Sequence, residues 1–328
     1  MHPLLETSVM TETVRMFGSP PNYWFLQNLF KSETTATYRA EWYLRRLTRN
    51  VAPLQSRGRE GTMRAGEVFE YHDATYLHTR PKDLVLNVDA QTLRKPGSSD
   101  TTEAYGRQLV LDRTEHLRRQ VDRTMEWVGA QMLQATSQNL TIDGAVISVA
   151  SGLSTTHCPT AVGTWATSNY DIISDIVTNK ALIVQDSGEV PDFIMMTEQV
   201  HGYLINNSEI QEYIRESSDV NSVILEGRMK RLMGLDIVIY EERYTTDAGT
   251  ITRMWPNEYV LFGCLPAKSQ TKMLIGPSED TGAVGATPGI FSKTWELPDP
   301  PGVHILLDAN FYPVVGVPDA FVFLCVQP

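Results

Sequence analysis

Cysteine is scarce in this sequence. The chain has 328 residues and three cysteines, Cys158, Cys264 and Cys325. They are far apart and odd in number, so neither a disulfide framework nor a closely spaced metal-binding pair can be built from them. We expect reduced, partly buried thiols.

Long apolar runs are also missing. No stretch approaches the about 20 apolar residues that span a bilayer. The opening sequence, MHPLLETSVMTETVRMF, lacks the charged, apolar and small-residue zones of a signal peptide. We therefore expect no membrane association and a protein that stays in the cytosol where it is made.

Signatures of catalysis are weak. The glycine-rich segment 276–289, GPSEDTGAVGATPG, lacks the Lys-Ser/Thr pair of a phosphate-binding loop. Ser154 lacks the complete GxSxG frame of a hydrolase nucleophile turn, because Thr156 stands where the second glycine would be. His157 and Cys158 are adjacent, but no third group is evident that would orient them as a nucleophile pair. We predict that the protein is not an enzyme and has no catalytic, cofactor or metal site.

Positive charge is scarce in one part of the chain. Residues 1–138 carry 18 Lys and Arg against 16 Asp and Glu, a net charge of +2. Because the whole chain has a net charge of −11, residues 139–328 have a net charge of −13. This excess of acid argues against nucleic-acid binding by the bulk of the chain. It permits head-to-tail attraction between copies.

The first 50 residues have the composition of an arm. GSPPNYWFLQNLF places several aromatic residues behind a Pro-Pro pair, and AEWYLRRLTRN is a short amphipathic stretch. Together they are too small to form a domain. The arm either packs on its own domain or lies across a neighbouring chain.

An unusual charged segment follows at residues 57–81, RGREGTMRAGEVFEYHDATYLHTRP. EVFEYHDATY and the later DLVLNVDAQTL partly alternate as strands do, and Gly58, Gly61 and Gly66 suit a hairpin tip. Such a hairpin has too little apolar surface to be stable alone. It could be an Arg/Gly arm that binds nucleic acid, a disordered linker, or a hairpin that docks on another chain.

The strongest helical signal begins near Asp100, which with Glu103 resembles a capping box. About 36 residues would give a helix of roughly 54 Å. Its apolar face is predicted to consist of Val110, Leu117, Val121, Met125, Val128 and Met132. The opposite side is predicted to carry Arg113, Arg118, Arg119, Asp122, Arg123 and Glu126.

Beyond Asn139 the pattern is mixed α/β. Expected helices are NYDIISDIVTNKALIV, TEQVHGYLINNSEIQEYIRE (one or two) and LEGRMKRLM. Expected strands are TIDGAVISV, VPDFIMM, GLDIVIYEE and NEYVLFGC. HILLDANFYPVVGVPDAFVFLCVQ should form two closing strands with a turn at Val317-Pro318-Asp319. The chain length favours two domains, or one domain with long extensions.

This order of parts resembles the major capsid proteins of tailed bacteriophages, in the lambda-like branch of the Hong Kong 97 fold. The motifs that carry the resemblance are Phe25, Leu26, Leu29 and Phe30 in the arm; Ala52-Pro53; Gly61, Phe69, Tyr76 and Arg80-Pro81-Lys82; Leu93-Arg94 and Gly97; and the closing YPVVGVPDAFVFLCVQ.

The resemblance implies an α+β fold with five parts. They are an N-terminal arm at 1–50, an extension loop (a β-hairpin) at 51–97, a peripheral domain with a long spine helix at 98–150, an axial domain at 151–300, and closing strands of the peripheral domain at 301–328. The extension loop of the family lies over the adjacent subunit, so its strands obtain a core only after assembly.

The resemblance also implies a function and partners. The expected protein is a major capsid protein that assembles with itself, as hexamers and pentamers, into an icosahedral shell enclosing double-stranded DNA without reading its sequence. Expected partners are a scaffolding protein, a portal and a decoration protein. A separate scaffold is expected because no scaffolding segment precedes the arm. The expected location is the virion, after assembly in the host cytoplasm.

Residues expected at contacts between subunits follow from the same resemblance. For the arm and loop they are Phe25, Leu29, Phe30, Arg57, Arg59, Arg64, Phe69, Tyr76 and Arg80. For the charged face of the spine helix they are Arg118, Arg119 and Glu126.

Three alternatives stay open on the sequence. One is the shell of a nanocompartment that encloses protein, which the contents of the particle would distinguish. Another is a nucleic-acid-binding protein that uses residues 57–95, for which salt-dependent oligonucleotide binding would be the sign. The third is an α/β enzyme, which would need a titrating residue in a pocket.

Overall fold

The computed structural model describes residues 7–18, 20–46, 68–86, 102–142, 145–216, 228–246, 249–278 and 289–327. The chain divides into two compact units, each built from separate stretches. Unit 1 comprises Met1–Glu41, Asp73–Gly129 and Lys272–Pro313; unit 2 comprises Trp42–His72, Ala130–Thr271 and Val314–Pro328.

Unit 1 is organised around a six-stranded sheet whose longest strand is β16 (Pro301–Val314). The main path of the sheet is β1 (Ser32–Thr34), β14 (Lys272–Ile275), β16 and β15 (Phe291–Pro298), and both β4 (Leu77–Thr79) and β5 (Lys82–Leu86) also pair with β16. Ile305 and Leu307, which alternate along β16, are fully buried. Strand β5, whose residues are expected in the extension loop, therefore pairs in the core sheet, and its Val85 is buried.

The predicted long helix is present as α3 (Thr102–Met132, 31 residues), of which the part up to Gly129 belongs to unit 1. Its apolar face is confirmed where the side chains are described, with Leu117, Val121 and Met125 buried. The predicted charged face is wrong at Asp122 and Glu126, because both are buried. Each follows an apolar position by one residue, about 100° around the helix, so it borders the apolar face instead of opposing it.

The described part of the N-terminal arm packs on its own unit. It forms α1 (Thr7–Met16) and a short π-helix, η2 (Phe25–Leu29). Thr11 Oγ1 donates to Ser292 O and accepts from Ser292 N, both at 3.2 Å, which fixes α1 along the outer edge of β15. The later AEWYLRR segment forms a strand, β2 (Ala40–Arg46).

Unit 2 contains a five-stranded sheet. Its order is β17 (Phe321–Cys325), β13 (Tyr259–Gly263), β8 (Phe193–Met196), β10 (Leu235–Ile239) and β9 (Arg231–Leu232). All four residues of β8 are buried, as the VPDFIMM pattern predicts. The two closing strands, expected in one domain, pair in different sheets: β16 pairs in unit 1, whereas β17 pairs with β13.

Close packing in this sheet depends on one glycine. Gly263 pairs with Phe193 on one side and Phe321 on the other. A Cβ at this position would lie 2.7 Å from both aromatic rings. Only a residue without a side chain lets the two rings approach this strand.

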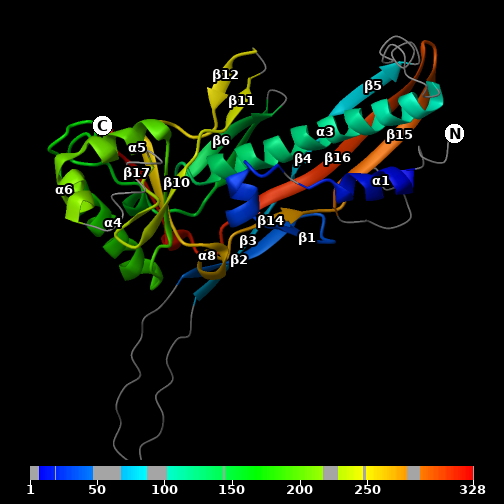
Figure 1. Cartoon of the computed structure of the whole chain (residues 1–328). Coiled ribbons are helices and arrows are strands. Elements are labelled where there is room, and N and C mark those ends of the chain that lie inside the picture. Colours follow the sequence, from blue (N-terminus) through cyan, green and yellow to red (C-terminus); the bar gives the residue numbers. More distant parts are fainter. Residues whose placement is uncertain are drawn as a thin grey trace, which may run out of the picture. The chain divides into compact units, whose positions relative to one another are not determined.

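Helices of unit 2 lie beside its sheet (Figure 1). They are α4 (Ile172–Ser187), α5 (Glu198–Asn206), α6 (Ser208–Glu216) and α8 (Pro266–Ser269), with 3-10 turns η3 (Thr155–His157) and η5 (Pro318–Ala320). The Asp171 side chain caps α4 by accepting from Ser174 N at 2.8 Å, and α4 ends at Gly188 with φ of 81°.

The third predicted helix, LEGRMKRLM, is not a helix in its described part. Arg231–Leu232 is strand β9, and it turns back into β10 with Leu232 opposite Leu235. Met233 and Gly234 have φ values of 50° and 83°, so the chain forms a tight turn that a helix cannot contain.

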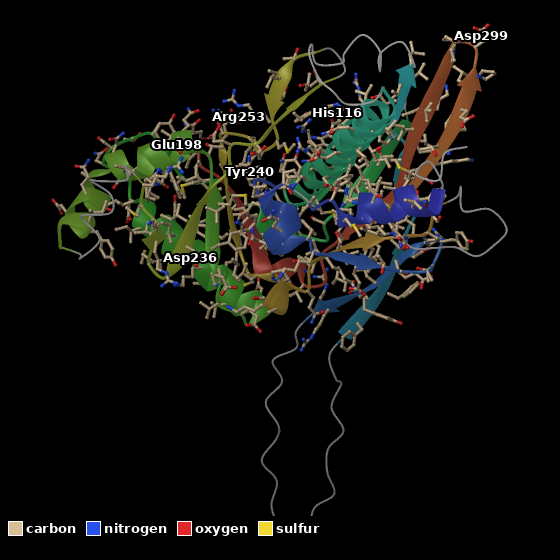
Figure 2. All side chains as sticks on the ribbon, turned by 45° about the vertical axis from the view of Figure 1, so that its right-hand side comes forward. His116, Glu198, Asp236, Tyr240, Arg253 and Asp299 are labelled. Atoms are coloured by element: carbon tan, nitrogen blue, oxygen red, sulfur yellow. The ribbon has the colours of Figure 1, made fainter. Side chains whose placement is uncertain are left out.

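Three two-stranded ribbons complete the described fold. They are β2 with β3 (Val68–Ala74), β6 (Ser137–Ile142) with β7 (Ala145–Ala150), and β11 (Arg243–Thr245) with β12 (Ile251–Arg253). Glu241 supports the last ribbon: it lies 3.1 Å from Arg253 Nε and accepts from Glu198 N at 2.9 Å (Figure 2 labels Arg253 and Glu198).

Several predicted features lie outside the described residues. They are the cap at Asp100, the hairpin tip at 58–66, the run after Leu86 up to residue 101, and most of the glycine-rich segment 276–289. No described helix is long and apolar enough to cross a bilayer.

Candidate assembly surface

The β2–β3 ribbon has two unlike faces. Residues alternate between the faces of a strand, so Tyr43, Phe69 and Tyr71 share one face. These three side chains are 63%, 59% and 56% exposed, and we call them the aromatic face. The rings of Tyr43 and Tyr71 meet edge to face across the ribbon, with centroids 5.8 Å apart.

The opposite face of the ribbon contacts unit 2. Leu44 is buried, and its Cδ1 would lie 3.0 Å from a Cβ on Gly152. Arg45 N donates to Gly316 O at 2.8 Å. The Trp42 and His72 rings stack with an interplanar angle of 18° on the same side as Leu44. The ribbon is therefore fixed by one face, and its aromatic face is the one exposed to solvent.

Exposed aromatic side chains in a cluster are an unusual feature of a folded chain. Each such side chain can bury about 150–250 Å². Clustered apolar surface of this kind marks a site of interaction with a partner. The half-exposed pair Arg46–Glu70, with 3.6 Å between nitrogen and oxygen, lies on the other face of the ribbon. Such a pair adds little to stability in water.

Phe25, Leu29 and Phe30, which the sequence places at subunit contacts, lie in the core of unit 1. All three are fully buried. Phe30 packs against Gly129 of α3, where a Cβ would be 3.1 Å from its ring. Their side chains contribute to the fold of their own chain, and no surface of theirs is open to a neighbouring subunit.

Glu126 and Arg118 also bind the chain's own arm. The buried Glu126 carboxylate accepts from Phe25 N at 3.0 Å and Leu26 N at 2.8 Å, which satisfies backbone donors at the start of η2. Arg118 donates to Asp122 at 3.0 Å and to Val14 O at 3.4 Å. We call Arg118, Asp122 and Glu126 the polar stripe of α3.

The remaining described residues of the predicted set are divided. Arg119 is exposed and bonded to Glu115 one turn earlier. Tyr76 is buried against Gly276, whereas Phe69 belongs to the aromatic face. Arg80 is partly exposed, 3.9 Å from Asp308.

Asp308 is a fully buried carboxylate in unit 1. It binds His78 Nε2 and Ser278 Oγ, in addition to its longer contact with Arg80. The charge of Asp308 is thus compensated within the unit, as a buried carboxylate requires. Arg57, Arg59 and Arg64 of the predicted set lie outside the described residues.

Two members of the aromatic face are absent from the residues singled out on the sequence. Tyr43 and Tyr71 could have been found from the alternation of Phe69 with Tyr71 and from the Tyr in AEWYLRR. The sequence does not show that β2 pairs with β3 across residues 47–67, and this pairing brings Tyr43 beside Tyr71.

The thiols have the surroundings of structural cysteines. Burial, with a contribution from the Asp192 charge, raises the pKa of Cys264 to about 12. Burial also raises the pKa of Cys158. Both therefore stay protonated near neutral pH, where a nucleophile would need to be a thiolate. Among the described residues, no three His, Cys, Asp or Glu side chains gather as a metal site would require.

Comparison with known families identifies the chain. A family model described as phage major capsid protein E matches residues 6–326. The chain belongs to this family. It is therefore a phage major capsid protein, a structural protein that associates with itself to form the shell of the head, and it is not an enzyme. No curated protein matches the sequence.

Solved structures share the fold at low identity. A protein assigned as the capsid protein of a prophage of E. coli CFT073 is 14% identical, with 98% of this chain and 99% of that chain covered and a TM-score of 0.71. A phage-related protein of Bordetella bronchiseptica RB50 is 13% identical over 97% and 96%, with a TM-score of 0.58. The mature capsid of bacteriophage PhiM1 is 12% identical over 94% and 87%, with a TM-score of 0.54. The predicted α+β, Hong Kong 97-like capsid fold is confirmed.

Proposed function

We propose that the aromatic face of the β2–β3 ribbon is a contact through which neighbouring copies join in the shell. The observation that carries the proposal is the exposure of Tyr43, Phe69 and Tyr71 on a ribbon whose other face is fixed to its own unit. The ribbon flanks residues 47–67, which include the expected tip of the extension loop at 58–66. In this role Arg57, Arg59 and Arg64 supply polar contacts farther along the same loop.

Repetition makes such a contact effective. One rim-exposed ion pair contributes about 0.2–1 kcal/mol, and an aromatic pair adds about 0.5–1.5 kcal/mol beyond the burial of its area. Every copy in a shell repeats the same contact. A weak interface therefore suffices for assembly, while free subunits stay soluble.

The finer partners are part of the same proposal. Family membership and the net charge of −11 support a shell that encloses double-stranded DNA without adhering to it. We expect hexamers and pentamers, a scaffolding protein, a portal and a decoration protein, with assembly in the host cytoplasm. Unit 1 would serve as the peripheral domain and unit 2 as the axial domain.

The test compares two variants of the full chain with the wild type. In one, Tyr43, Phe69 and Tyr71 are all changed to Ser. The matched control is Tyr38→Ser, since Tyr38 is 73% exposed but lies before β2. Circular dichroism reports folding, and negative-stain imaging with and without scaffold reports shells. We expect folded protein in both variants and shells in the control only. Wild-type shell yield from the triple variant would overturn the proposal.

The contents of the shells separate the remaining alternatives. Nuclease-protected double-stranded DNA in particles from infected cells fits a phage head, whereas a packaged protein fits a nanocompartment. Oligonucleotide binding by unassembled subunits, weakened by salt, would favour a nucleic-acid role for residues 57–95.

A further inference from the structure

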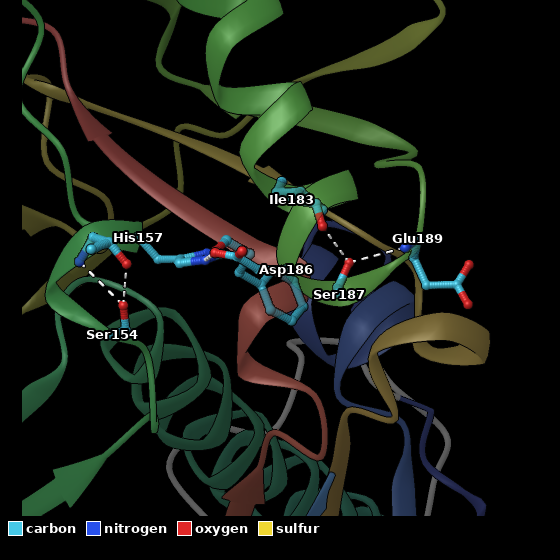
Figure 3. Close-up of polar contacts among 8 residues, drawn as sticks. Ser154, His157, Ile183, Asp186, Ser187 and Glu189 are labelled. Atoms are coloured by element: carbon cyan, nitrogen blue, oxygen red, sulfur yellow. Dashed lines mark hydrogen bonds and ion pairs between the residues drawn. The ribbon is translucent and has the colours of Figure 1, made fainter. Parts of the chain in front are cut away.

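A buried histidine in unit 2 takes no part in the candidate assembly surface. His157 is the last residue of η3, and its side chain is 1% exposed. Its Nδ1 lies 2.7 Å from the Phe321 carbonyl oxygen, and its Nε2 lies 2.9 Å from Asp186 Oδ2 (Figure 3). The ring thus joins η3, the first residue of the C-terminal strand β17, and the last turn of α4.

Hydrogen-bond chemistry fixes the number of protons in this arrangement. A carbonyl oxygen only accepts, so Nδ1 must carry a proton. An ionised carboxylate also only accepts, so a second proton must lie between Nε2 and Asp186. An imidazole is more basic than a carboxylate, so we place that proton on Nε2, and the pair carries one proton more than a neutral imidazole and a free carboxylate would.

The other titratable groups on the packed elements do not replace Asp186. They are Asp175 and Lys180 on α4, Asp319 on η5, Cys158 next to η3, and Cys325 at the end of β17. Asp175 accepts from Trp165 Nε1, and Lys180 donates to Met233 O. Burial raises the pKa of the Cys158 thiol, which keeps it uncharged.

We propose that His157 and Asp186 form a proton-dependent clasp that holds the start of β17 against η3 and α4. When the second proton leaves, the lone pair of Nε2 faces a carboxylate at hydrogen-bond distance, and the clasp becomes repulsive. Raising the pH therefore loosens the closing strand of unit 2, and lowering it tightens the strand. This device is independent of the proposed role of the aromatic face.

Linkage gives the sign and size of the effect. Above neutral pH a free imidazole is mostly uncharged, so opening the clasp releases one proton. The opening equilibrium then rises with pH, by up to about tenfold per pH unit. A clasp without the second proton would show no such slope.

The direct test is nitrogen-15 NMR of the full chain labelled at histidine. The His157 signals are identified by their loss in His157→Gln, or by their displacement in Asp186→Asn if the first variant does not fold. At pH 7.5 we expect both ring nitrogens of His157 to be protonated, and we expect Asp186→Asn to convert the ring to the neutral form with a proton on Nδ1. A neutral His157 ring in the wild type at this pH would overturn the proposal.

Hydrogen exchange gives a second readout. In the wild type, the opening constant of the β17 amides, corrected for intrinsic exchange, should rise by up to tenfold per pH unit from pH 7.5 to 9. Asp186→Asn should abolish this slope. Asp236→Asn is the control, because Asp236 is an exposed carboxylate paired with Arg231 in the same unit, and it should keep the slope. An unchanged slope in Asp186→Asn would contradict the clasp.

Discussion

In the five-stranded sheet of unit 2, Phe262 and Phe321 are fully buried by their own chain. In the β2–β3 ribbon, Tyr43, Phe69 and Tyr71 are each more than half exposed. Both regions are β-structure with aromatic side chains, yet only the sheet buries them within one subunit. The difference suggests that aromatic residues in the sheet stabilise the subunit, whereas those in the ribbon act when subunits meet.

The largest effect should come from truncating an aromatic residue in the sheet. Phe262 of β13 has a paired strand on each side and is fully buried, so Phe262→Ala should lower the free energy of unfolding by about 3–5 kcal/mol. Denaturant unfolding of the unassembled subunit measures this. A loss below about 1 kcal/mol would be within the range of surface positions. Aromatic residues of the sheet would then stabilise the subunit no more than those of the ribbon.

An intermediate effect is expected in the polar stripe of α3. Glu126→Ala leaves the N–H groups of Phe25 and Leu26 buried without their acceptor, which should cost about 1–3 kcal/mol. Glu115→Ala is the control, since Glu115 forms an exposed pair with Arg119 and its loss should cost no more than about 0.5 kcal/mol. Thermal unfolding of both variants, side by side, measures the difference. Equal losses would mean that the arm does not depend on this carboxylate.

A smaller effect is expected at the edge of the ribbon. Arg46→Gln removes the half-exposed ion pair with Glu70, so the free energy of unfolding should fall by less than about 1 kcal/mol. The loss should shrink further in high salt, because salt screens exposed charges. A large loss of unfolding free energy that does not depend on salt would mean that the pair is shielded from water.

The smallest effect on the subunit should come from the aromatic face itself. Phe69→Ser should change the free energy of unfolding by no more than about 0.5 kcal/mol, as at other exposed positions. The same variant should raise the subunit concentration at which shells form, measured by light scattering. A destabilisation of several kcal/mol would show that Phe69 belongs to the core of its own chain.

The long helix and the buried strands could be predicted because their patterns are local. Seven-, four- and three-residue spacing gives α3, and a continuous apolar run gives β8. Which strand joins which sheet depends on contacts between distant residues, so the separation of β16 from β17 could not be predicted.

The same limit applied to the candidate surface. In the sequence, Phe25, Leu29 and Phe30 suggest an arm that binds a neighbouring subunit. In the fold they are buried in their own chain, beside α3. Glu126 looks like a surface charge, yet it lies where it can bind two backbone N–H groups of the arm. Burial of a charged residue follows from a partner that only the fold supplies.

Hydroxyl-radical footprinting of free subunits and assembled shells tests the central claim most directly. The side chains to follow are Tyr43, Phe69 and Tyr71, with the buried Phe25 and Phe30 as internal references. If neighbouring copies cover the aromatic face, oxidation of its three side chains falls on assembly while the references stay low in both states. Equal oxidation of the aromatic face in subunits and shells would contradict the account.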